Sequence, residues 1–249
     1  MSSIVLVGAS GRMGSQLEAL IASSDDLEVV ARVDAGQRLE EVVADRLVDC
    51  VIDFSVLDQV IPTLDWACER RVPVVLGTTG LEETHRAALH AAASVIPIVW
   101  APNFSVGVNA MFAVASELVS LVGAGWDLEL VDSHHRHKVD APSGTARRLI
   151  ELLAEARDAT YESAARFGRQ GLVGPRTEEE IGVNVLRGGS VVGTHEVHYL
   201  GEGEELVLTH RATDRAIFAR GALRASRWLL GDPDRAPALY DMGDVLRYS

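Results

Sequence analysis

The chain has 249 residues, of which 47% are apolar and 24% charged, and 23 basic against 36 acidic side chains give a net charge of −13. These proportions exclude wholesale disorder, and the acidic excess argues against nucleic acid and anionic membranes as partners. No apolar run reaches the ~18–20 residues that span a bilayer. The start lacks the basic region of a signal peptide, and the two cysteines form no zinc spacing or disulfide framework. We expect a cytoplasmic protein of one large or two small domains.

The first hundred residues alternate apolar runs with segments of helical periodicity. Runs that are apolar throughout and are separated by helices predict a parallel sheet covered on both faces. The short connections between these segments are typical of such α/β units. The expected strands are Ile4–Val7, Val29–Val33, Val48–Phe54, Val72–Leu76 and Val95–Trp100.

The pattern changes after Asn103. Residues 157–180 carry charges and glycines without a clear period, and we expect them to form a long loop. Strands joined by glycine-containing turns and a last helix follow, before an irregular tail. The expected elements are the helices Gly107–Val122, Thr145–Ala156 and Arg215–Leu230 and the strands Asp127–Val131, Ile181–Leu186, Val191–Tyr199 and Glu205–Arg211.

A glycine-rich loop, G-A-S-G-R-M-G at 8–14, lies between the first expected strand and an amphipathic helix. In that position glycine permits a tight turn, and backbone N–H groups at the helix start can hold a pyrophosphate. Asp34 ends the second strand, where a carboxylate can accept hydrogen bonds from an adenosine ribose. The pattern predicts a dinucleotide site that favours NADH. The alternative is an ordinary tight turn with a solvated acid.

Three further turns end expected strands on the same edge of the sheet: Asp53–Ser55, G-T-T-G at 77–80 and Ala101–Phe104. Parallel sheets bind ligands at this edge. Together the turns could line the nicotinamide ribose, although each taken alone reads as an ordinary turn.

A basic cluster stands out in this acidic chain: His134, His135 and His137, with Arg136 and Lys138 among them. Such a patch would concentrate an anionic substrate. Shortly after it, Ser143 suits the N-cap of a helix, and the N–H groups that follow can hold a carboxylate. The cluster therefore predicts a site for a small molecule that carries carboxylates.

Histidine and lysine can both donate protons, so His134 or Lys138 could protonate the atom that receives negative charge when a hydride is delivered. Three histidines so close in sequence do not converge naturally on one ion, and we expect no metal. A solvated basic loop is the alternative interpretation of the cluster. His195, His198 and His210 lie in strand-like runs and are expected to be sheet or interface residues.

The segment H-H-R-H-K-V-D-A-P-S-G-T-A at 134–146 resembles the signature of the 4-hydroxy-tetrahydrodipicolinate reductase family, also called dihydrodipicolinate reductases. The resemblance extends in the family's order over nearly the whole chain. Its further motifs are the glycine-rich loop, I-D-F-S at 52–55, G-T-T-G at 77–80, A-P-N-F-S-V-G-V-N at 101–109, V-V-G-T-H at 191–195 and Tyr240-Asp241-Met242.

The resemblance implies an α/β fold with two domains. A Rossmann-type parallel sheet with helices on both faces would span 1–105 and 216–249, and an α+β domain with a mixed sheet at 106–215 would bind substrate and form a homotetramer. The implied reaction is the NAD(P)H-dependent reduction of 4-hydroxy-tetrahydrodipicolinate to tetrahydrodipicolinate, with loss of water, in diaminopimelate and lysine biosynthesis.

The resemblance also implies residue roles. His134 would be the proton donor and Lys138 its catalytic partner. The substrate carboxylates would be held by His135, Lys138, Ser143, Gly144 and Thr145, and the cofactor by Gly8, Gly11, Arg12, Met13, Asp34, Phe54, Gly77, Thr79, Pro102, Asn103 and Phe104.

Two departures from the family pattern concern the cofactor. The stretch between Asp34 and Val48 is shorter than in many members, and Ala35 stands where an arginine could hold a 2′-phosphate. We therefore expect NADH, with NADPH possible. Two other functions stay open: an NAD(P)-dependent oxidoreductase of another small carboxylic acid, and a non-enzymatic nucleotide sensor on the same fold. The retained His134 and Lys138 argue against a sensor.

Overall fold

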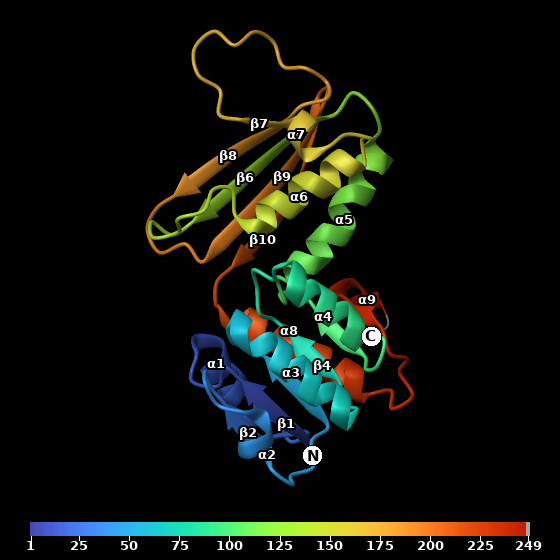
Figure 1. The fold of residues 1–249 in the computed structure, drawn as a ribbon. Helices are drawn as coiled ribbons and strands as arrows, with labels where there is room; N and C mark the ends of the chain where they lie inside the picture. Colours follow the sequence, from blue (N-terminus) through green and yellow to red (C-terminus); the bar gives the residue numbers. More distant parts are fainter. Residues whose placement is uncertain (248–249) are drawn as a thin grey trace. The chain divides into compact units, whose positions relative to one another are not determined.

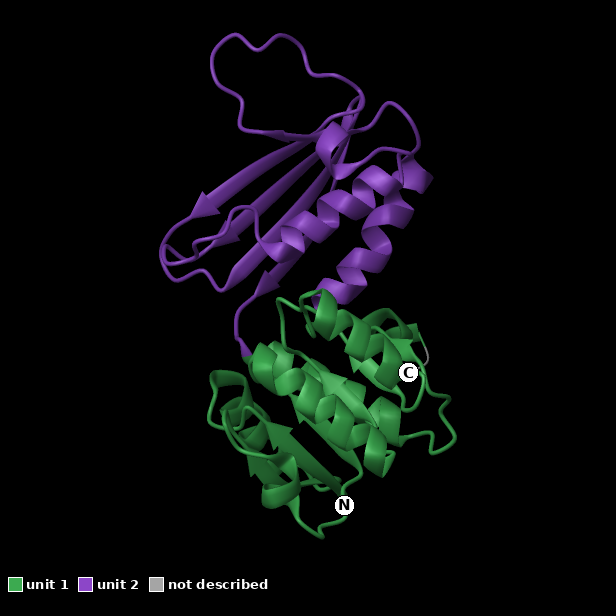
Figure 2. Ribbon diagram, viewed as in Figure 1, with its two compact units in different colours: residues 1–106, 216–249 green, residues 107–215 purple. Residues whose placement is uncertain are grey.

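The computed structural model describes residues 1–247, which form two compact units. Unit 1 comprises Met1–Val106 together with the C-terminal segment from Ala216, and unit 2 comprises Gly107–Arg215 (Figure 2). The last two residues of the expected dinucleotide-binding domain, 248 and 249, lie outside the described part of the chain.

Unit 1 is built on a six-stranded parallel sheet with the strand order β11-β5-β4-β3-β1-β2. Figure 1 labels β1, β2 and β4 of this sheet. Every strand pairs in parallel because a helix or a longer connection returns the chain between strands. The strands are β1 (Ser2–Val7), β2 (Leu27–Val33), β3 (Cys50–Asp53), β4 (Val74–Leu76), β5 (Ile98–Trp100) and β11 (Leu239–Tyr240). The helices are α1 (Arg12–Ala22), α2 (Leu39–Val43), α3 (Leu57–Arg70), α4 (Glu83–Ala93), α8 (Ala216–Leu230) and α9 (Met242–Arg247).

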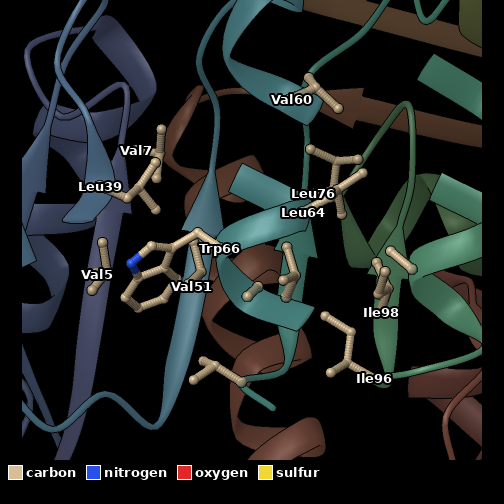
Figure 3. Close-up of a cluster of buried hydrophobic side chains, with 14 of the residues drawn as sticks. Val5, Val7, Leu39, Val51, Val60, Leu64, Trp66, Leu76, Ile96 and Ile98 are labelled. Atoms are coloured by element: carbon tan, nitrogen blue, oxygen red, sulfur yellow. The ribbon is translucent and has the colours of Figure 1, made fainter. Parts of the chain in front are cut away.

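The β1 sequence explains why helices cover both faces of this sheet. Val5 and Val7 point into one apolar cluster, with residues of α2, α3 and α4 (Figure 3). Ile4 and Leu6 point into the opposite cluster, with residues of α1, α8 and α9. Because side chains alternate between faces along a strand, an unbroken apolar run is buried on both sides.

Unit 2 is a five-stranded mixed sheet with the order β10-β9-β6-β8-β7. Its core lies between one sheet face and the helices α5 and α6, and includes Leu128, Leu130, Tyr199, Met111 and Leu149. The strands are β6 (Asp127–His134), β7 (Ala165–Phe167), β8 (Ile181–Arg187), β9 (Gly193–Gly201) and β10 (Glu204–Ala212), and the helices are α5 (Val106–Val122), α6 (Gly144–Glu155) and α7 (Tyr161–Ala164).

The fold class predicted from the sequence is confirmed, and the differences are local. Residues 157–180 were expected to be a loop, but Tyr161–Ala164 is helical and Ala165–Phe167 pairs in parallel with β8. The tail was expected to be irregular, but it contains β11 and α9. The strand expected from Val191 begins at Gly193. Among residues 1–247, no helix has both the length and the apolar character that a membrane crossing requires.

Candidate active site

In unit 1 the chain turns sharply between β1 and α1. Gly8 has a φ of 81°, and a Cβ at this position would lie 2.6 Å from the carbonyl oxygen of Phe54. Gly11 is the N-cap of α1 and has no side chain to occupy the first-turn N–H groups. The turn therefore leaves a helix N-terminus that can receive an anion such as a pyrophosphate.

Asp34 lies beside this loop, as the sequence predicts, but it is already engaged. Its Oδ1 atom accepts hydrogen bonds from the backbone N–H of Ser10 at 2.8 Å and from the Ser10 hydroxyl at 2.9 Å. Both bonds use the same carboxylate oxygen. Asp34 thus ties the end of β2 to the glycine-rich loop.

A pocket of about 480 Å³ opens at the carboxyl edge of the sheet of unit 1. Eight of the predicted cofactor residues line it, whereas Gly8, Gly11 and Asp34 do not. The Phe54 ring packs against Gly77 and requires glycine there, because a Cβ at position 77 would lie 2.1 Å from Cε1 of the ring. The lining comprises Arg12, Met13, Phe54, Ser55, Gly77, Thr78, Thr79, Pro102, Asn103, Phe104 and Phe218.

Asp53, which is fully buried at the end of β3, holds two of the residues that line this pocket. Its Oδ1 accepts hydrogen bonds from the Ser55 N–H at 2.9 Å and from the Thr78 hydroxyl at 3.0 Å. Burial raises the pKa of Asp53 even though these bonds oppose the shift. One carboxyl group therefore joins two of the three turns that the sequence places together.

Sequence reasoning missed Phe218, which also lines the pocket. It comes from α8, near the end of the described chain, and it reaches the pocket because the segment from Ala216 folds back into unit 1. No local sequence motif indicates that Phe218 lines the pocket.

In unit 2 the predicted basic cluster is organised around a residue that the sequence analysis did not single out, Asp132 in β6. Its carboxylate is fully buried. His134 Nδ1 lies 2.9 Å from Oδ1, and Arg187 Nη2 lies 3.1 Å from Oδ2. Although burial opposes it, contacts with His134, Ser143 and Arg187 hold the pKa of Asp132 well below its usual range.

Asp132 could have been found from the strand pattern. It follows the inward-facing Leu128 and Leu130 in the same phase, and side chains two residues apart share one face of a strand. A carboxylate in a core position must be paired or hydrogen-bonded, so an acid there marks a polar cluster. Arg187 in β8 gives no such local signal.

His195 is a buried sheet residue of β9, and its side chain also belongs to this cluster. The register of β9 places it opposite Asp132. Its Nε2 lies 3.4 Å from Oδ1 of Asp132 and 3.2 Å from Oγ of Ser143. Burial lowers the pKa of His195 to about 4, which keeps the ring neutral near pH 7.

The start of α6 has the predicted form. Ser143 is the N-cap, and its hydroxyl accepts a hydrogen bond from the Ala146 N–H at 3.2 Å. Gly144 opens the helix and Thr145 follows it. The preceding loop carries Lys138, whose ammonium group lies 2.8 Å from Oδ1 of Asp140. A cation and a helix N-terminus thus lie on the same stretch of chain, and both favour an anion.

His135 and His137 flank this arrangement, with ring centroids 6.2 Å apart. Desolvation and the positive charges around it, with Arg215 foremost, lower the pKa of His135. The structure does not direct these two rings to the Asp132 carboxylate, where His134 and His195 lie.

Asp132, His134 and His195 each offer one ligand atom within 4.8 Å of the others, the spacing of a metal site. The carboxylate oxygens are already occupied, because Ser143 donates to both of them and Arg187 supplies a positive charge. This donor set is matched by protein groups rather than left open for a cation. The expectation of no metal stays a prediction.

Comparisons with known proteins agree over the whole chain. Residues 2–104 match the family model "Dihydrodipicolinate reductase, N-terminus", and residues 107–246 match "Dihydrodipicolinate reductase, C-terminus". A 4-hydroxy-tetrahydrodipicolinate reductase of Akkermansia muciniphila is 47% identical over 249 residues, covering 100% of this chain and 99% of the relative. One from Myxococcus xanthus is 45% identical, covering 98% of this chain and 97% of the relative.

Among solved structures, a dipicolinate-bound dihydrodipicolinate reductase from Paenisporosarcina sp. TG-14 is similar in fold, with a TM-score of 0.76 and 21% identity. The similarity covers 97% of both chains.

Proposed function

Because the chain belongs to the dihydrodipicolinate reductase family, we propose that it reduces 4-hydroxy-tetrahydrodipicolinate to tetrahydrodipicolinate with NAD(P)H. Water is lost, and the product enters diaminopimelate and lysine biosynthesis. The observation that carries the proposal is the cluster in unit 2, where His134 contacts a buried carboxylate and Lys138 precedes a capped helix start. A proton donor beside an anion-binding site is what the reduction of a cyclic dicarboxylate requires.

Unit 1 is assigned the dinucleotide. The turn at Gly8 and Gly11 and the residues Arg12 and Met13 would hold the pyrophosphate, and the pocket around Phe54 would hold the nicotinamide end. This assignment is supported by the close fit at Gly8, where a Cβ would strike the chain. When bound, the reduced nicotinamide supplies the hydride. The remaining contacts would come from Asp34, Gly77, Thr79, Pro102, Asn103 and Phe104.

Unit 2 is assigned the substrate. His134 would give its proton to the substrate atom that gains negative charge, and Lys138 would be its catalytic partner. The N–H groups at the start of α6 and the positive charge of Lys138 would hold the two carboxylates, with His135, Ser143, Gly144 and Thr145 as further contacts. A nucleotide sensor, the alternative function, would not need a proton donor that a buried carboxylate holds in place.

The preferred cofactor in this proposal is NADH. Asp34 would repel the 2′-phosphate of NADPH, and Ala35 offers no compensating charge. Two nearby arginines are already paired, Arg32 with Glu18 and Arg38 with Glu40. NADPH would therefore be accepted to a lesser degree than NADH.

A homotetramer formed through the sheet of unit 2 completes the proposal. The face of that sheet opposite α5 and α6 exposes apolar side chains, with Leu186 at 52% and Val207 at 43%. Exposed apolar groups on a regular face are typical of an interface between subunits.

The test is the loss of nicotinamide absorbance with substrate generated in place by the preceding synthase, with NADH and NADPH run in parallel. Oxidation that depends on the synthase product, faster with NADH, supports the function and the cofactor preference. Pyridine-2,6-dicarboxylate, a planar mimic of the substrate, should inhibit it. Bound NADH without oxidation would point instead to a sensor or to another carboxylic acid as substrate.

A further inference from the structure

The Asp132 carboxylate joins the two halves of the proposed substrate site. On one side Oδ1 lies 2.9 Å from Nδ1 of His134. On the other side the Ser143 hydroxyl donates to Oδ1 at 2.9 Å, and the Ser143 backbone N–H donates to Oδ2 at 2.9 Å. The proton donor and the helix start that would hold a carboxylate are therefore fixed by the same buried group.

The opposite edge of the His134 ring lies against Gly193, the first residue of β9. A Cβ at Gly193 would lie 3.1 Å from Nε2 and 3.5 Å from Cδ2 of the ring. The backbone at Gly193 does not have a positive φ, so the conformation there does not demand glycine. What the position provides is room for the ring.

His195 limits the ring from a third direction. The two imidazoles meet edge to face, with centroids 5.3 Å apart. Asp132 contacts Nδ1, Gly193 leaves room at Nε2, and His195 packs against the ring. Only 11% of the His134 side chain is exposed, so the ring has little freedom to turn.

We propose that Asp132 and Gly193 are positioning residues for the reduction: they orient His134 so that Nε2 is the atom that donates the proton, and Asp132 also fixes the start of α6. This inference rests on the proposed function. A carboxylate that holds one imidazole nitrogen determines which nitrogen is left for proton transfer. Arg187 offsets the charge of Asp132, so the carboxylate can stay ionised while it is buried.

The test compares two substitutions with two matched controls. Asp132→Asn removes the charge but keeps the shape, and Asp127→Asn makes the same change at the other end of β6, where the carboxylate pairs with Arg176. Gly193→Ala pushes a methyl group against the ring. Gly188→Ala adds the same methyl group where no atom lies within 4 Å.

For Asp132→Asn we expect kcat to fall by about 10²-fold and the KM for substrate to rise, because both halves of the site lose their tether. For Gly193→Ala we expect kcat to fall by about tenfold with little change in KM for substrate. In both variants the solvent deuterium isotope effect on kcat should rise, because proton donation becomes slower. Both controls should keep the wild-type kcat, and all four variants should bind NADH as the wild type does.

Asp132→Asn leaves Arg187 without its counter-charge and can fail to fold, whereas Gly193→Ala leaves that ion pair intact and carries the test alone. The inference is overturned if Gly193→Ala retains full kcat, or if kcat falls without a rise in the isotope effect. Failure of the proposed function looks different, because the wild-type protein itself would then leave the synthase product unreduced.

Discussion

Lys138 is the only lysine in a chain that carries 22 arginines. Every other position that carries a lysine or an arginine is an arginine, including those in the ion pairs of Arg169 with Glu129 and of Arg227 with Asp26. A guanidinium keeps its proton at any physiological pH, whereas an ammonium group can donate one. The single exception therefore falls at the residue whose proposed role needs a group that can donate its proton.

Substituting Lys138 separates charge from proton transfer. We expect Lys138→Ala to lower kcat by about 10²-fold or more, and Lys138→Arg to restore at most a small part of it although it restores the charge. NADH affinity, measured by fluorescence titration, should be unchanged in both variants. Recovery of wild-type kcat in Lys138→Arg would reduce the role of Lys138 to electrostatics.

Removal of metal tests the cluster around Asp132. The hydrogen bonds from Ser143 and the ion pair with Arg187 already satisfy this carboxylate. We expect prolonged dialysis against EDTA, or addition of zinc after it, to leave kcat at its untreated value. Loss of activity on chelation that a divalent metal restores would establish a metal site at Asp132, His134 and His195.

At the scale of elements, the sequence predicts those segments that carry their own periodicity. The apolar run of β1 and the capped helix that starts after Ser143 are both found where the pattern places them. The strand β7 has three residues and exists because β8 offers it a partner in parallel register. Likewise β11 has two residues and depends on β5. Pairing with a distant strand leaves no local signature.

The candidate site shows the same contrast between residues with a local sequence signal and residues placed by strand pairing. His134 and Ser143 belong to one continuous motif and were predicted together. His195 enters through the register that pairs it with Asp132, and no feature of β9 alone reveals that register. What the sequence could not show is therefore the convergence of β6, β8 and β9 on one carboxylate.

The ion pair between α8 and the turn before β2 links the last long helix to the first strands. Arg227 donates to both oxygens of Asp26, at 2.6 and 2.9 Å, and this bond lowers the pKa of Asp26 to about 2. A lowered carboxylate pKa stabilises the fold above the unfolded-state value near 4, and the contribution disappears as the pH falls toward 2.

We expect Asp26→Asn to lower the free energy of unfolding by about 0.5–1 kcal/mol at pH 7, since both side chains are half exposed. The difference from wild type should shrink as the pH is lowered from about 4 to 2. Urea titrations at each pH measure it, with Asp25→Asn, the exposed neighbour, as the control. An equal effect of Asp26→Asn at pH 7 and pH 2 would contradict this account.

At the scale of the whole molecule, the exposed surface of one chain determines how it can assemble with copies of itself. The sheet of unit 2 is covered by α5 and α6 on one face, while Leu186 and Val207 on the other remain accessible. Burying such a face between subunits would remove the apolar surface from water.

The double substitution Leu186→Asp and Val207→Asp should therefore convert the proposed tetramer to smaller species, because charges would have to be buried at the interface. Light scattering after size-exclusion chromatography measures the mass. Leu47→Asp, which changes a leucine of unit 1 that is 87% exposed, is the control. A tetramer that survives the double substitution would place the interface elsewhere.

The division of unit 1 between two distant segments of the chain has a consequence for its folding during synthesis on the ribosome. When residue 215 has been added, every residue of unit 2 has been made, but α8, β11 and α9 have not. Until they emerge, one apolar face of the first sheet lacks Ala222, Leu223 and Leu229, and the edge of β5 has no neighbour. The nascent chain therefore exposes the apolar face of an incomplete unit 1 until the segment from Ala216 has been translated. We expect chaperones to bind it during this interval.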